Sequence, residues 1–165
     1  MRPLICVAAA ALLAACSSSS SEVQISDLAV SGLSVTAEKT TYSAADINAG
    51  EDGVRATLTA ATDQPFYARL GDAFNGAVDQ NPIYLAAGTD GTAERQSGST
   101  WVAAESGILV EGVREVVLSP GKTYTMLATL ARPVQSGTYR LRVSVRDQSG
   151  GNVTRTVVSP TFQIR

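Results

Sequence analysis

The stretch Thr138–Arg146, TYRLRVSVR, alternates between apolar and polar residues over its whole length. The apolar positions are Tyr139, Leu141, Val143 and Val145, and the polar positions are Thr138, Arg140, Arg142, Ser144 and Arg146. Because successive side chains of a β-strand point to opposite faces, this alternation predicts a strand that buries one face and exposes the other. Residues 148–152, which contain Gly and Asn, follow it and predict a hairpin loop.

Shorter segments of the same kind lie on both sides of this stretch, separated by clusters of Gly, Pro, Asn and Asp. They predict strands within 25–35 and at 54–61, 66–70, 83–87, 100–103, 113–118, 122–130, 153–158 and 161–164. Helical signals are weak, and residues 44–49 have room for a single turn. This pattern predicts an all-β protein, an antiparallel β-sandwich of about 7–9 strands. We expect Trp101, the only Trp, to pack between the two sheets.

Three segments carry a more specific pattern. They are Leu118–Tyr124 (LSPGKTY), Ser136–Leu141 (SGTYRL), and Asp90-Gly91 followed by Trp101-Val102. These segments resemble parts of bacterial immunoglobulin-like domains in surface and secreted proteins. Tyr139 also resembles the tyrosine corner of such sandwiches, in which the hydroxyl bonds a backbone group upstream. The resemblance covers roughly residues 35–164 and implies an immunoglobulin-like fold, which by itself implies no particular activity because that fold carries many unrelated functions.

The N-terminus shows a different pattern. Arg2 is followed by an uncharged apolar run at residues 4–15, which is too short to span a bilayer of ~30 Å but has the length of a secretory signal peptide's apolar region. The run ends in Leu13-Ala14-Ala15-Cys16, which resembles the lipobox of bacterial lipoproteins. This resemblance implies a diacylglycerol on the sulfur of Cys16, cleavage before Cys16 and acylation of the new amino terminus. The alternatives are an ordinary signal peptide with a chance Cys, or a buried apolar segment.

The domain organisation follows from these patterns: a signal peptide at 1–15, a lipidated Cys16 with a tether at 16–27, and a sandwich at 28–165. The Ser run at 17–21 buries nothing, so it is expected to be a flexible tether. Several acyl chains on one residue make a durable anchor. Ser17 directly after Cys16 is compatible with export to the outer membrane of a Gram-negative bacterium. We expect a lipid-anchored cell-envelope protein whose anchor contacts the membrane.

The residue inventory excludes several kinds of chemistry. The chain has no His, Cys6 lies in the signal peptide and Cys16 carries lipid, so a Ser-His-Asp triad, thiol catalysis and a disulfide in the mature chain are all excluded. Cleavage before Cys16 removes one of the 13 basic residues and none of the 15 acidic ones, which leaves a net charge of −3 and argues against nucleic acid as a partner. We expect no cofactor and no enzymatic activity.

One acidic segment, Asp46–Asp52, has oxygen-bearing side chains spaced somewhat like those of a calcium-binding loop. Such a loop requires Gly at its sixth position, where this chain has Glu51, and a Glu at its twelfth, which is missing. An acidic surface loop is the preferred interpretation, and calcium binding stays an open question. A pair of catalytic carboxylates within this segment is disfavoured, because adjacent acids in a loop are usually only solvated.

The sequence also suggests a basic face. If the strand with Tyr67 and Arg69 lies beside the strand with Arg140, Arg142 and Arg146, their outward side chains share one sheet face. Such a face could meet an acidic glycan, an anionic lipid head group or an acidic protein, because guanidinium groups pair well with carboxylate and phosphate. The simpler interpretation, which we prefer, is that outward strand positions need solubilising residues.

Together these features predict a membrane-anchored cell-envelope lipoprotein with a non-catalytic immunoglobulin-like binding or structural module. Its expected partner is an envelope protein or a surface glycan. The alternative function is a carbohydrate-binding module at the cell surface. In that case Tyr67, Tyr84 or Trp101 would be exposed and would contact sugar rings.

Overall fold

The computed structural model describes residues 32–49, 53–71, 82–104 and 112–165. Cys16, the lipobox and the Ser run lie outside these residues, as do Glu51 and Asp52. The described part contains one short helix and twelve strands: β1 (Leu33–Ala37), β2 (Thr41–Tyr42), α1 (Ala44–Asn48), β3 (Val54–Ala60), β4 (Phe66–Gly71), β5 (Ile83–Leu85), β6 (Gly91–Ser97), β7 (Thr100–Ala103), β8 (Val113–Leu118), β9 (Lys122–Ala128), β10 (Gly137–Val145), β11 (Arg155–Val158) and β12 (Phe162–Ile164).

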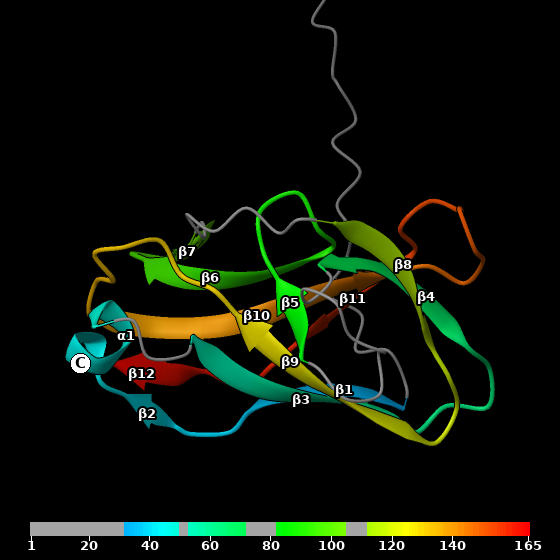
Figure 1. Ribbon diagram of the computed structural model, residues 1–165, viewed down its shortest axis with the longest axis horizontal. Helices are drawn as coiled ribbons and strands as arrows, with labels where there is room; N and C mark the ends of the chain where they lie inside the picture. The colour runs from blue at the N-terminus through cyan, green and yellow to red at the C-terminus, as the bar shows by residue number, and fades with distance from the viewer. Residues whose placement is uncertain (1–31, 50–52, 72–81, 105–111) are drawn as a thin grey trace, which may run out of the picture.

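The strands form two sheets packed face to face, which confirms the predicted all-β sandwich (Figure 1). The first sheet has the order β1-β3-β9-β5-β4-β8, and the second has the order β2-β12-β10-β6-β7 with β11 also paired to β10. The sheets are mixed rather than purely antiparallel, because β5 pairs with β9 and β2 pairs with β12 in parallel. The structure has a strand at each of the ten segments predicted from the sequence and adds β2 and β6, so its twelve strands exceed the expected 7–9.

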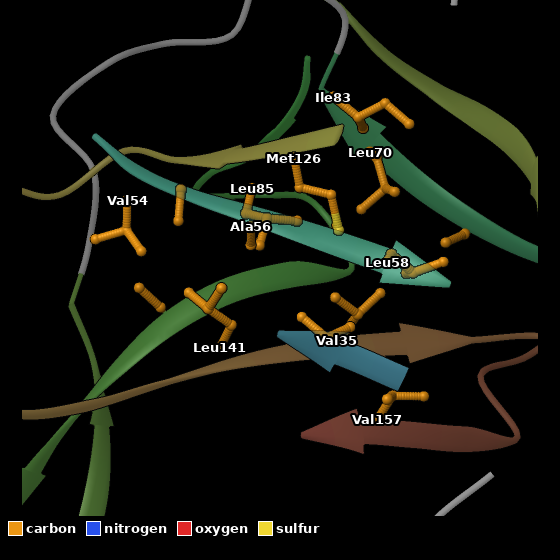
Figure 2. Close-up of a cluster of buried hydrophobic side chains, with 14 of the residues drawn as sticks. Val35, Val54, Ala56, Leu58, Leu70, Ile83, Leu85, Met126, Leu141 and Val157 are labelled. Atoms are coloured by element: carbon orange, nitrogen blue, oxygen red, sulfur yellow. The ribbon is translucent and has the colours of Figure 1, made fainter. Parts of the chain in front are cut away.

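The core forms where the alternating faces of the two sheets meet. In β10 the residues at every second position, Tyr139, Leu141, Val143 and Val145, are buried as predicted. In β3 of the other sheet, Val54, Ala56, Leu58 and Ala60 are fully buried. Figure 2 shows Leu141 and Val157 of the second sheet facing Ala56, Leu58 and Met126 of the first. Each large apolar side chain removed from water in this way contributes roughly 1.5–3 kcal/mol.

Two segments lie beside β10 on the side opposite β11 and β12. Tyr67 of β4 exchanges two backbone hydrogen bonds with Arg146, of 3.0 and 2.8 Å, and β6 pairs with β10 from Val143 to Tyr139. All of β4 nevertheless lies in the first sheet, where it pairs with β8 from Phe66 to Gly71 and with β5 at Gly71, so the chain crosses between the sheets before β6.

Asp90 joins the two segments at this crossing. Its backbone N–H donates to Arg69 O (2.7 Å), and its side-chain Oδ2 accepts from the Arg69 N–H (2.5 Å). Its carboxylate also accepts hydrogen bonds from both terminal nitrogens of Arg146, Nη1 to Oδ2 and Nη2 to Oδ1, the second at 3.0 Å. The two side chains are 14% and 9% exposed, and the hydrogen bond to Asp90 raises the pKa of Arg146 above its usual range. Asp90 therefore holds β4, β6 and β10 together through one carboxylate.

Tyr139 has the hydrogen bond that its resemblance to a tyrosine corner implies. Its hydroxyl donates to the backbone oxygen of Gln135, four residues upstream, at 2.6 Å. Its ring stacks on Phe162 of β12 with a centroid distance of 6.0 Å. Burial of the hydroxyl raises the pKa of Tyr139 above 10.0. The contact fixes the loop before β10 against the start of that strand.

Replacing Asp90 with Asn should lower the free energy of unfolding by about 3 kcal/mol, because Arg146 keeps its charge in a buried place without a carboxylate. Urea unfolding measures the loss. The matched control is Asp147→Asn, since Asp147 lies 3.6 Å from Arg155 and both side chains are more than 40% exposed. That control should cost less than about 1 kcal/mol. Equal losses in the two variants would contradict the role given to Asp90.

Tyr139→Phe should lower the free energy of unfolding by about 1 kcal/mol, because Gln135 O loses its donor. Chemical unfolding of the two proteins provides the measurement. Tyr67→Phe is the control, since the Tyr67 hydroxyl has no hydrogen-bond partner in the described ranges. If both variants are as stable as the parent, the hydroxyl of Tyr139 does not stabilise the corner.

Candidate functional site

The five residues of the predicted basic face lie in three different places. Arg140 and Arg142 point outward from β10 on the outer face of the second sheet, as expected. Arg146 is buried in its ion pair with Asp90. Tyr67 and Arg69 lie on the outer face of the first sheet. The prediction of one shared face was therefore wrong, because all of β4 lies in the first sheet with β8, and an isolated bridge from Tyr67 to Arg146 is its contact with the end of β10.

Glu94 of β6 lies between the two outward arginines. Arg140 Nε donates to Glu94 Oε2 at 2.7 Å, and Arg142 Nε lies 2.9 Å from Glu94 Oε1. Glu94 is buried beneath the two side chains. Arg140, Arg142 and Glu94, here called the Arg-Glu-Arg cluster, carry two positive charges and one negative charge.

Sequence reasoning missed Glu94 because it missed β6. The run Gly91–Ser97 has too few large apolar residues to show the alternation of a strand. A usable signal was present: Gly98 and Ser99 form the two-residue loop between β6 and β7, and Gly98 has a φ of +62°. A loop of this length and type predicts a strand on each side of it.

Trp101 is on the outer face of the second sheet, and the expectation that it packs in the core was wrong. Trp101 lies on the edge strand β7, where it is opposite Gln96 of β6, and it is half-buried. The guanidinium carbon of Arg140 lies 4.4 Å from the centroid of its ring, which is a cation–π contact. Tyr67 and Tyr84 lie in the first sheet, so the three aromatic residues do not form one platform. Only Trp101 adjoins the Arg-Glu-Arg cluster.

A pocket of about 250 Å³ opens beside Arg142. Its wall contains Thr92, which is opposite Arg142 in the β6–β10 register, and Ala103 and Ala104 at the end of β7. Thr129 and the turn 86–89 complete the lining. The pocket combines one cationic side chain with hydroxyl groups and small apolar side chains, a combination suited to a small polar ligand.

The acidic segment Asp46–Asp52 is only partly described. Asp46 belongs to α1, and its N–H donates to Ser43 Oγ at the start of that helix (3.2 Å). In the described ranges, no group of three or more His, Cys, Asp or Glu side chains is placed to hold a metal ion. The interpretation of this segment as an acidic surface loop stays a prediction.

Glu115 of β8 holds the loop between β10 and β11. Its carboxylate accepts a hydrogen bond from Ser149 Oγ and a second from the Gly150 N–H at 2.8 Å. The Ser149 bond is the main cause, and the Gly150 bond the second, of a Glu115 pKa below its ordinary value of 4.5. The contact joins the last strand of the first sheet to a loop of the second.

No protein-family model, curated protein or solved structure matches this chain. Within the described residues, no helix is long and apolar enough to cross a membrane.

The contact at Glu115 should depend on pH. Because the folded pKa is lowered, its stabilising effect is present above about pH 4.5 and is lost as the pH falls through the folded pKa. We expect the parent chain to be more stable than Glu115→Gln at pH 7, with the difference disappearing toward pH 3. Thermal unfolding of both proteins across this range tests it. A difference that stays constant with pH would mean that ionisation of Glu115 does not hold the loop.

Proposed function

We propose that this chain is a cell-envelope lipoprotein, anchored through Cys16 in the outer membrane of a Gram-negative bacterium, whose sandwich is a non-catalytic binding or structural module. The observation that carries the proposal is Leu13-Ala14-Ala15-Cys16 at the end of a short uncharged run, followed by an unbroken Ser run. The strand pairing supports it. Strands β1, β3 and β9 pair as A, B and E would in an immunoglobulin-like sandwich, and β12, β10, β6 and β7 pair as G, F, C and C′ would. Many cell-surface domains share this architecture.

The way the charged groups are used supports a role without catalysis. Asp90 and Glu115 hold strands and loops together, and Glu94 pairs with Arg140 and Arg142. Each of these carboxylates accepts hydrogen bonds from an arginine side chain or from groups of a loop. A general acid or base needs instead a carboxyl group free to exchange protons with a substrate.

The place where the chain enters the sandwich decides which end of the module is next to the tether. Gly32 O accepts a hydrogen bond from the Ala61 N–H, so the chain enters beside the β3–β4 loop. Helix α1 and Arg165 lie at the opposite end, where the Ala44 N–H donates to Arg165 O at 2.7 Å (Figure 1). An anchored sandwich would then be tethered at its β3–β4 end, with its sheet faces accessible to envelope partners.

A second candidate function is a carbohydrate-binding module at the cell surface. It is favoured by the position of Trp101, which lies on an outer face beside Arg140 rather than in the core. Aromatic rings at such positions supply apolar surface together with a polar edge. The two candidates differ in ligand class, since one requires a protein surface and the other a sugar.

Replacing Cys16 with Ser should move the protein from the membrane fraction to the soluble periplasmic or secreted fraction, because the thioether cannot form. Cell fractionation followed by immunoblotting measures the shift, and intact mass of the native protein measures the acyl groups directly. Cys6→Ser is the matched control and should stay with the membrane. A native mature chain without fatty acyl groups would refute the anchor.

A further inference from the structure

The guanidinium group of Arg142 is only partly compensated. Arg140 takes the well-formed hydrogen bond to Glu94, whereas Arg142 Nε lies 2.9 Å from the other carboxylate oxygen without the geometry of a hydrogen bond. That Nε is buried and has no hydrogen-bond partner among the described residues. The side chain of Arg142 is 39% exposed, compared with 18% for Arg140. Arg142 is thus the more accessible charge of the cluster.

The charge of Arg142 suits a ligand with one negative charge. Glu94 accepts its hydrogen bond from Arg140, so the guanidinium group of Arg142 lines the pocket without a hydrogen-bonded carboxylate. A guanidinium group binds a carboxylate through two parallel hydrogen bonds, which makes carboxylate a good match. A phosphate carries a charge of about −1.5 to −2 and is a poorer match for a pocket lined by one arginine.

The walls of the pocket suit a sugar ring. Thr92 and Thr129 contribute hydroxyl-bearing side chains to the lining. Thr129 Oγ1 donates to Leu85 O over 3.5 Å, which is a long and weak hydrogen bond. Ala103 and Ala104 give a small apolar surface that could face the C–H groups of a ring. A volume of about 250 Å³ is below the roughly 300 Å³ at which pockets for drug-sized ligands begin, so one ring fits rather than several.

Trp101 extends this surface along β7. It lies two residues before Ala103 on the same face of the strand, a separation of about 7 Å. A second ring of the same glycan would therefore reach the indole. We propose that the pocket beside Arg142 binds the carboxylate of a sugar acid, a uronic acid residue of an acidic glycan. This inference rests on the binding role proposed above and names its ligand class.

Trp101 provides the test, because it is the only Trp in the chain and adjoins the site. The full chain, purified in detergent, is titrated with a trimer of galacturonic acid while the Trp fluorescence is recorded. A saturable change is expected for the parent, with at least a tenfold loss of affinity in Arg142→Gln. Arg69→Gln removes the same charge from the outer face of the other sheet and should bind as the parent does. The neutral trimer of galactose should bind at least tenfold more weakly than the acidic one.

A second variant guards against loss of the fold. Ala103→Leu fills the pocket without changing a charge, and it should also abolish the response while the thermal unfolding curve stays cooperative. The proposal is overturned by an unaltered affinity in Arg142→Gln, by equal binding of the neutral trimer, by competition from inorganic phosphate as strong as that from the sugar acid, or by no response of the parent. Membrane fractionation is independent of this titration, so a chain that stays anchored but fails to bind refutes the sugar acid and leaves the lipoprotein proposal in place.

Discussion

The buried ion pair of Asp90 and Arg146 is the interaction on which the arrangement of strands depends. Removing two charges from water is costly, and their attraction offsets this cost only where both find well-placed partners. Asp90 meets that condition by binding Arg146 and the backbone of Arg69, while Arg146 also donates from Nε to Gly151 O at 2.7 Å. A shift of β4 or β6 by one residue would leave these charges buried and unpaired, so the pair specifies the register of three strands.

The crossing of the chain near this ion pair decides which strands and side chains lie beside β10. Because β6 takes the place beside β10, it brings Glu94 under Arg140 and Arg142 and supports the edge strand that carries Trp101. Because β4 meets the end of β10 only through the bridge from Tyr67 to Arg146, it lies in the other sheet together with β5 and β8. The ion pair therefore ties this part of the first sheet to the start of β6 in the second.

The outer face of the second sheet combines structural and recognition properties. Arg140 and Arg142 carry like charges on one face of a single strand, and Glu94 between them lowers their repulsion. Glu94 accepts its hydrogen bond from Arg140, while the guanidinium group of Arg142 lines a pocket on the same sheet face as Trp101. This arrangement supports the proposal of a small acidic ligand at this face.

The sequence by itself determined the two-sheet architecture, because strict alternation in segments such as Thr138–Arg146 buries one face of each strand and the weak helical signals leave a second sheet to cover that face. The alternation also predicted that Arg140 and Arg142 share one face, since their spacing is a local property of a strand. Only the tertiary structure decided which strand lies beside which, and with it the burial of Arg146, the outward position of Trp101 and the place of Glu94. Those features depend on pairings between residues far apart in the chain, and a periodicity read along the chain carries no information about such pairings.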